Sequence, residues 1–132
     1  MRNKPGLALA ALTLSLCGIA GTASAHHGTA SFDRSKITSL KGTVTNFIWA
    51  NPHGGIEFDV RDSDGKIENW QGSLTSPNWL ARAGWTKSTL KPGDVITVSG
   101  NQSKNRANTL WITKIQLANG QELPVGGIEN LQ

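Results

Sequence analysis

Apolar and polar residues alternate along most of the chain beyond residue 36, with the two-residue period of strands that are buried on one face. In Ile56 to Arg61, the clearest segment, Ile56, Phe58 and Val60 would share one face and the charged residues the other. Clusters of Gly, Pro, Asn and Asp, which are typical of turns, separate such segments. The pattern predicts strands over Leu40–Trp49, Ile56–Arg61, Lys66–Ser73, Val95–Gly100 and Thr109–Leu117, with a short final strand over Gln121–Val125 as an option.

The period changes once, at Ser76–Gly84, where a short helix is predicted. Ser76 can cap the first free amides, Pro77 suits the first helical position, and Gly84 suits a left-handed stop. The order strand-strand-strand-helix-strand-strand predicts an all-β fold with a small inserted helix. It is the order of an OB-fold, a five-stranded Greek-key barrel, and an open sandwich is the alternative.

The first residues have the pattern of a secretory signal peptide. Arg2 and Lys4 form a positive start, Leu7–Ala20 is mostly apolar and uncharged, and Ala23-Ser24-Ala25 has the small residues of a cleavage site. We expect residues 1–25 to be removed on export, and we expect the protein to be periplasmic or secreted. The apolar stretch is short for a membrane span, which needs about 20 residues, so no span is expected after processing. A retained anchor is the alternative.

Cleavage would leave 107 of the 132 residues: a polar N-terminal arm over 26–36 and one OB-like domain over 37–132. The only cysteine, Cys17, leaves with the leader, so the mature chain would have no disulfide. Eleven basic residues then face nine acidic ones, which gives a net charge of +2 rather than +4. No cluster of Lys and Arg is visible along the sequence, and we therefore expect no nucleic-acid partner.

A series of short motifs spans nearly all of this mature chain. They are His26-His27, Phe32-Asp33, Leu40 to Val44, Trp49 to His53, Ser76 to Asn78, Gly84 to Thr86 and Leu90 to Asp94. With these motifs the chain resembles DUF6152, a family of small exported bacterial proteins of unknown function. The resemblance implies an architecture and a location, and it implies no activity. This chain departs at Gly54-Gly55, where a bulkier residue is expected after His53, and we expect a looser loop there.

The three histidines of the chain would all survive processing. Cleavage after Ala25 makes His26 the first residue, and its α-amine and ring Nδ1 can then chelate a metal together. A second imidazole completes a histidine brace, whose tetragonal nitrogen set favours copper(II). The predicted ligands are His26 and His53, with His27 as a substitute or fourth ligand. From Ser31 back to His26 is five steps along the chain, which reach about 16–18 Å if extended. The alternative is a solvated tail and an ordinary loop histidine.

The five tryptophans are many for a small domain without tyrosine. Trp49 and Trp70 are candidates for a surface that stacks on a flat ligand, and burial in the core is the alternative. Trp70 lies three residues after Ile67, so the two cannot share one face of a strand without a bulge.

Enzyme signals are weak, and we lean against an enzyme. The chain has no G-x-S-x-G or H-E-x-x-H motif, and Asp59, Asp62 and Asp64 lack the spacing of an EF-hand. Two classes of function remain. One is an exported metal carrier, buffer or sensor, with copper favoured. The other is an OB-type adaptor that binds a protein, peptide or small ligand through its barrel face and tryptophans, without a metal.

Overall fold

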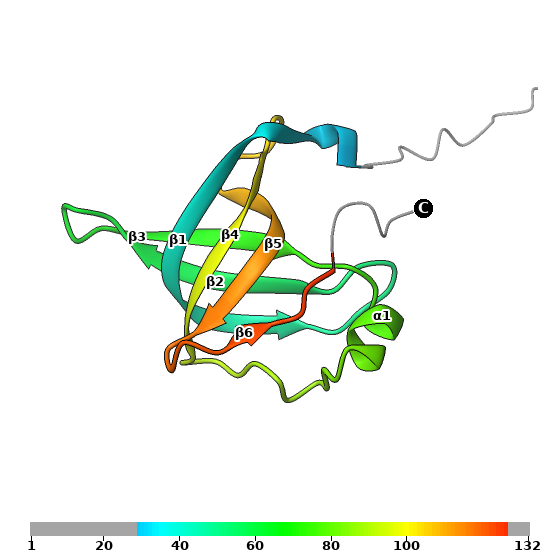
Figure 1. Cartoon of the computed structure of the whole chain (residues 1–132). Coiled ribbons are helices and arrows are strands. Elements are labelled where there is room, and N and C mark those ends of the chain that lie inside the picture. Colours follow the sequence, from blue (N-terminus) through cyan, green and yellow to red (C-terminus); the bar gives the residue numbers. More distant parts are fainter. Residues whose placement is uncertain (1–28, 127–132) are drawn as a thin grey trace, which may run out of the picture.

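Six β-strands, one short α-helix and one turn of 3-10 helix make up residues 29–126, the part of the chain that the computed structural model describes (Figure 1). In chain order they are η1 (Thr29–Ser31), β1 (Phe32–Ile48), β2 (Gly55–Arg61), β3 (Ile67–Ser73), α1 (Pro77–Arg82), β4 (Val95–Ser103), β5 (Thr109–Leu117) and β6 (Glu122–Leu123). Strands β2 to β5 and the helix lie where the alternation and the capping residues predict them, β1 begins earlier than predicted, and β6 is the short final strand.

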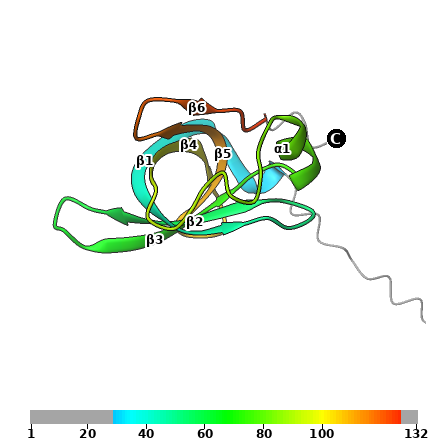
Figure 2. The same cartoon turned by 90° about the horizontal axis from the view of Figure 1, so that it is seen from below.

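The strands close into a ring. In sheet order they run β3-β2-β1-β4-β5-β6, and each neighbouring pair is antiparallel. β3 also pairs with β5 in parallel, through Gln71–Ser73 and Thr109–Trp111, and this short seam completes the ring (Figure 2). The helix falls between β3 and β4 in the chain. The predicted all-β, OB-fold-like architecture is therefore confirmed.

β1 is the strand that joins the two halves of the ring. It pairs with β4 through Ile37–Thr43 and with β2 through Thr43–Ile48, so that its direction changes near its middle. Gly42 permits the bend, since a Cβ there would lie 2.7 Å from the carbonyl oxygen of Asp59. The strand begins at Phe32, so residues 32–36 belong to β1 rather than to the arm that the sequence predicted over 26–36.

The inward faces of the strands form one core. Its buried apolar members are Val44, Ile56, Phe58, Trp70, Leu74, Leu80, Trp85, Leu90, Ile96, Val98, Leu110, Ile112, Ile115 and Val125. β2 and β3 keep a regular register, so no bulge is needed: Ile67 points outward at 53% exposure and Trp70 inward at 7%. The indole Nε1 of Trp85 donates to the carbonyl oxygen of Pro124 at 2.7 Å, which ties the segment after α1 to the segment after β6.

Helix α1 forms as its ends predict. The hydroxyl of Ser76 accepts a hydrogen bond from the backbone N–H of Trp79 at 3.3 Å, and Gly84 has a φ of +95° just after the helix. Leu80 is buried on the inner face of the helix. No helix among residues 29–126 is both long and apolar enough to cross a membrane.

Candidate functional site

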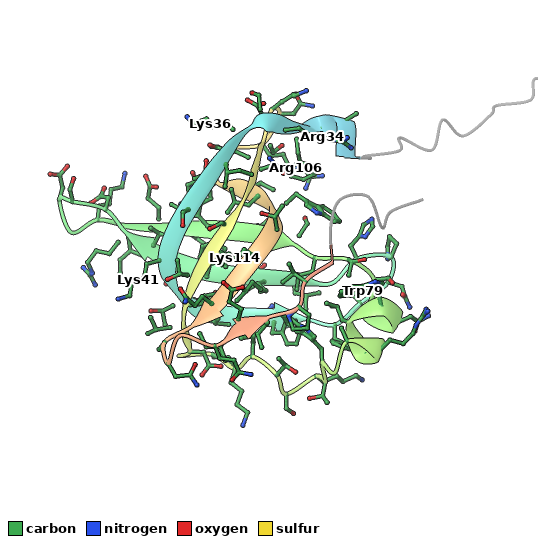
Figure 3. The ribbon with its side chains drawn as sticks, viewed as in Figure 1. Arg34, Lys36, Lys41, Trp79, Arg106 and Lys114 are labelled. Atoms are coloured by element: carbon green, nitrogen blue, oxygen red, sulfur yellow. The ribbon has the colours of Figure 1, made fainter. Side chains whose placement is uncertain are left out.

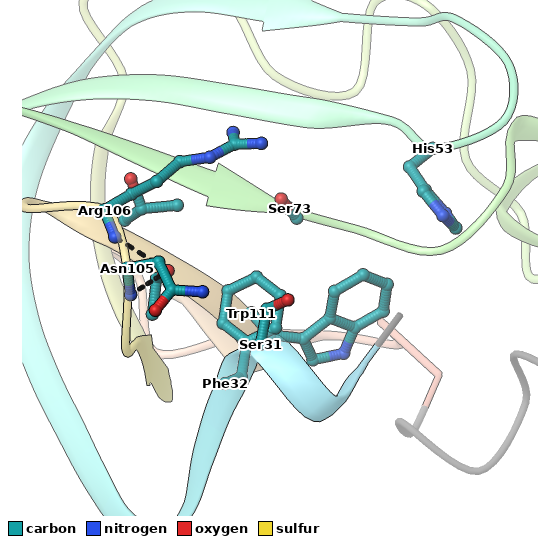
Figure 4. A pocket seen from close by; sticks show the side chains of 9 residues that line it. Ser31, Phe32, His53, Ser73, Asn105, Arg106 and Trp111 are labelled. Atoms are coloured by element: carbon teal, nitrogen blue, oxygen red, sulfur yellow. Dashed lines mark hydrogen bonds between the residues drawn. The ribbon is translucent and has the colours of Figure 1, made fainter. Parts of the chain in front are cut away.

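A cavity of about 250 Å³ lies where the β1–β2 loop (residues 49–54) and the β4–β5 loop (residues 104–108) approach the start of β1. Figure 4 shows its walls, which come from segments far apart in the chain. The lining residues are Ser31, Phe32, His53, Ser73, Ser103, Asn105, Arg106, Thr109 and Trp111. These two loops flank the ligand face of OB-folds in general, which makes this cavity the first place to seek a site.

The β1–β2 loop carries His53, and backbone hydrogen bonds fix the residue that follows it, Gly54. Gly54 exchanges backbone hydrogen bonds with the segment after β3, donating to the carbonyl of Thr75 at 3.0 Å and accepting from the N–H of Leu74 at 2.9 Å. Gly54 is buried, and a Cβ there would lie 3.2 Å from a methyl group of Leu80. The expected loosening at Gly54-Gly55 does not occur, because the missing side chain lets the backbone approach its partners closely.

Aromatic rings form one wall of the cavity. The exposed ring of His53 meets Trp111 edge to face, with 5.5 Å between the ring centroids. The ring of Trp111 also contacts the ring of Phe32 edge to face, with 5.9 Å between the ring centroids. Trp111 is only 4% exposed, so it forms the floor of the cavity rather than a surface on which a base or sugar could stack.

The indole Nε1 of Trp111 is buried and has no hydrogen-bond acceptor within residues 29–126. A buried donor without a partner costs about 1–3 kcal/mol. Its acceptor therefore has to be a water, a ligand, or a residue outside the described range. Trp70 Nε1 has the same property, but Trp70 lies in the core and not in the cavity wall.

The β4–β5 loop carries the polar side of the cavity. The hydroxyl of Ser103 accepts hydrogen bonds from the backbone N–H groups of Asn105 and Arg106, which turns the chain at the rim. The backbone N–H of Lys104 donates to the carbonyl of Ser31 at 2.8 Å, and its ammonium donates to the carbonyl of Ala30. These bonds hold η1 against the loop. In Figure 4 the side chain of Arg106 extends from the loop along the cavity.

Four cationic residues gather at this end of the ring, and we call them the basic rim: Arg34, Lys36, Lys104 and Arg106. The first two lie on β1 and the others on the β4–β5 loop, and the pairing of Phe32 with Ser103 brings the two segments together. Figure 3 shows Arg34, Lys36 and Arg106 around the same end. Sequence reasoning missed this cluster, because about 70 positions separate its two halves and neither half is a charge run.

One carboxylate, Asp33, lies beside the basic rim. The pKa of its carboxyl is held below the usual value of 3.8, chiefly by the hydrogen bonds that the Ser35 hydroxyl and backbone N–H donate to it, at 2.6 and 2.9 Å. Burial opposes this shift, and the charges of Lys104 and Lys36 assist it. Asp33 is therefore ionised at neutral pH, and its charge is directed to Ser35 rather than into the cavity.

Of the three predicted metal ligands, only His53 lies within the described residues, and it lines the cavity. His26 and His27 lie outside residues 29–126. No group of three His, Cys, Asp or Glu side chains suited to a metal occurs within that range. A metal site at His53 would thus need ligands from beyond it.

The two predicted stacking residues do not share a surface. Trp70 belongs to the core and is unavailable to a flat ligand. Trp49 is half-buried and meets the ring of Phe47 edge to face, with centroids 5.9 Å apart. The cavity uses Trp111 instead, which the sequence did not single out because it lies in a continuous apolar run between Leu110 and Ile112.

Several solved structures are similar to this chain, with TM-scores of 0.42 to 0.44. A ZRD-deleted mutant of TiaS in complex with agmatine is 23% identical, with a TM-score of 0.44, over 72% of this chain and 24% of that chain. A complex of TiaS with a tRNA and ATP is 22% identical, with a TM-score of 0.43, over 65% of this chain and 19% of that chain. This chain thus spans a quarter or less of the length of those proteins.

A mitochondrial single-stranded DNA-binding protein of S. cerevisiae, Rim1, is 13% identical, with a TM-score of 0.42, over 69% of this chain and 97% of that chain. A tRNA complex and a single-stranded DNA-binding protein are thus among the structures that are similar to this chain. The prediction that this protein has no nucleic-acid partner is corrected, because it was based on a missing basic surface, and the basic rim supplies one. Nucleic acid is therefore not excluded.

No curated protein matches the sequence significantly. A family model does match, over residues 13–111, which include β1 to β4, the start of β5 and both loops that enclose the cavity. The chain therefore belongs to DUF6152, a family of unknown function.

Proposed function

We propose that this protein is an exported metal-binding protein that holds copper(II) through His26 and His53. The α-amine and ring of His26 would supply two nitrogens, the ring of His53 a third, and His27 would act as a substitute or fourth ligand. The observation that carries the proposal is that Ser31 and His53 line the same cavity. The chain that leads back to His26 therefore enters the described structure beside the third histidine.

The reach of the chain supports the proposal. Residues 29–31 form η1, so the stretch that can extend towards His26 begins at Thr29, and its three steps span about 10–11 Å when extended. The bonds from Lys104 to Ala30 and Ser31 fix the point from which this reach is measured. A metal–nitrogen bond of about 2 Å then requires both imidazoles to lie within one coordination sphere at the cavity mouth.

The chemistry of the cavity favours copper. No Asp, Glu or Cys is among its lining residues, so the described walls offer imidazole and no carboxylate or thiolate. A set built from an amine and imidazoles suits the tetragonal geometry of copper(II), whereas calcium and magnesium prefer oxygen ligands. The exposure of His53 leaves its ring accessible to a metal.

The test is copper(II) titration of protein that was expressed as the whole chain and purified from the periplasm, with a competing chelator to fix the affinity. We expect a sub-micromolar Kd and an electron paramagnetic resonance spectrum of nitrogen ligation. His53→Ala, or a Gly-Ser extension before His26, should weaken binding by at least about tenfold, since either change removes one anchor of the chelate.

Lys87→Ala is the control, because Lys87 is exposed and lies outside the cavity. It should leave the affinity unchanged. Equal affinity of the protein with and without the Gly-Ser extension would falsify the brace.

A second candidate is an adaptor that binds a small ligand, a peptide or a protein without a metal. It is favoured by one observation: the cavity offers Arg106, Asn105 and Ser73 in addition to His53, which a metal site alone does not use. The metal content of protein purified from the periplasm separates the two, since the adaptor would contain no stoichiometric metal.

A further inference from the structure

The polar groups of the cavity include several hydrogen-bond donors, one of which is charged. Its lining includes the guanidinium of Arg106, the amide of Asn105 and the hydroxyls of Ser31 and Ser73. No carboxylate lines it. Groups of this kind, gathered without a negative partner, are complementary to an anion.

The guanidinium of Arg106 is the centre of this arrangement. Within residues 29–126 it forms no ion pair with a carboxylate. Its backbone, by contrast, is fixed, because its N–H donates to the hydroxyl of Ser103 at 3.1 Å. Figure 4 shows the side chain extending along the cavity towards the side on which Ser73 and His53 lie.

The basic rim places further positive charge at the end of the ring where the cavity lies. Lys36 and Lys104 raise the potential there, and the charge of Asp33 offsets part of it. Such a field concentrates small anions and speeds their association. It is screened by salt, so its contribution falls as ionic strength rises.

The opposite wall is apolar and aromatic. The rings of Phe32, Trp111 and His53 line it and contact one another edge to face. The cavity of about 250 Å³ is smaller than a site for a drug-sized ligand. A ligand that contacts both the polar wall and the aromatic wall therefore has one anionic group and a small apolar body.

We propose that this cavity binds a small organic carboxylate, whose two oxygens take the planar fork of Arg106 and whose apolar part lies against Phe32 and Trp111. A carboxylate fits better than inorganic phosphate, because phosphate would leave the aromatic wall unused. It also fits better than a nucleic-acid strand, because a cavity of about 250 Å³ holds one small group, whereas a strand needs a groove along which successive bases stack.

This inference does not require the copper site, although the two share a cavity. Copper at His53 would add positive charge near Arg106, so copper and carboxylate would each strengthen the binding of the other. The carboxylate is therefore tested first on metal-free protein from which the chelator has been removed.

The experiment titrates benzoate, acetate, inorganic phosphate and a deoxythymidine decamer into the ¹⁵N-labelled protein, expressed as the whole chain. Benzoate should bind more tightly than acetate or phosphate and should shift the signals of the Trp111 indole N–H, Ser73 and Asn105. Arg106→Gln should weaken benzoate binding by at least about tenfold. Arg82→Gln is the matched control, since it removes the same charge from an exposed position on α1 and should leave the affinity unchanged.

Three outcomes overturn the inference. Equal weakening by Arg106→Gln and Arg82→Gln would show a general charge effect, and tighter binding of the decamer through Arg106 would assign the cavity to nucleic acid. Benzoate binding that occurs only in copper-loaded protein would make the metal, not Arg106, the receptor. By contrast, failure of copper binding with intact benzoate binding would reject the proposed function and support this inference.

Discussion

Trp111 reaches the cavity because a glycine lies beside it on the neighbouring strand. Gly100 lies at a register shift between β4 and β5, where a Cβ would overlap the carbonyl oxygen of Trp111 and approach the Cα of Ile112 at 3.1 Å. The obstacle is backbone, which cannot rotate away as a side chain can. The glycine thus lets two strands pass closely at the point where the aromatic wall is built.

Gly100→Ala should therefore destabilise the protein by about 1–3 kcal/mol, the usual result of overpacking. Thermal unfolding measures the loss. Gly55→Ala is the matched control, because the nearest atom to a Cβ there is the carbonyl oxygen of Gly72 at 3.4 Å, an ordinary contact. Equal losses in the two variants would show that the contact with Trp111 has no special weight.

Among the elements, those predicted correctly have a local signal. The two-residue period marks β2, and Ser76 with Gly84 marks the ends of α1. The start of β1 lacks such a signal, because Asp33 to Lys36 are polar and three of these four residues are exposed. What fixes them is Asn101, whose side-chain amide donates to the carbonyls of Asp33 and Lys36 at 2.9 and 3.3 Å.

The residues of the candidate site, like the strands and the helix, could be predicted only where the sequence carries a local signal. His53 could be proposed from its residue type and its loop, and the structure places it in the cavity. Arg106 and Trp111 could not, because their role depends on the pairing of β1 with β4 and of β4 with β5. The copper ligands His26 and His27 stay a prediction, since they lie outside the described residues.

Asn101→Ala should release the first part of β1. We expect the amides of residues 33–37 to exchange with deuterium much faster, and a loss of about 1–2 kcal/mol in the free energy of unfolding, because two carbonyls lose a buried donor. Hydrogen exchange followed by mass spectrometry locates the effect.

Asn69→Ala is the comparison for this experiment. It removes an exposed amide that donates to Asp59 at 3.1 Å on the other side of the ring. It should leave exchange at residues 33–37 unchanged. Slow exchange there in Asn101→Ala would mean that strand pairing alone holds the segment.

At the scale of the whole molecule, a single hydrophobic core holds the parts of the ring together. Buried residues from β1 to β5, from α1 and from the segment after β6 belong to a single cluster. The parallel seam between β3 and β5 is short, so the ring depends on this shared core as much as on strand pairing. The residues that line the cavity belong to strands and loops of this ring, and the cavity has no hydrophobic core of its own within the described residues.

The described domain should therefore unfold in one step. Unfolding curves from far-ultraviolet circular dichroism and from tryptophan fluorescence should coincide. Val98→Ala, at a fully buried position of β4, should lower both midpoints equally, by about 1–3 kcal/mol in free energy. Separate midpoints would show that the aromatic cavity wall melts independently of the sheet.

The two loops around the cavity differ in how they are attached. Gly54 locks the histidine loop to the backbone after β3, whereas the hydrogen bonds of Asn105, Arg106 and Ala107 stay within their own turn. Residues 105–107 are also exposed. A graft that replaces these three residues would thus exchange the chemistry opposite His53 without disturbing the frame, which makes this small barrel a natural starting point for designed ligand selectivity.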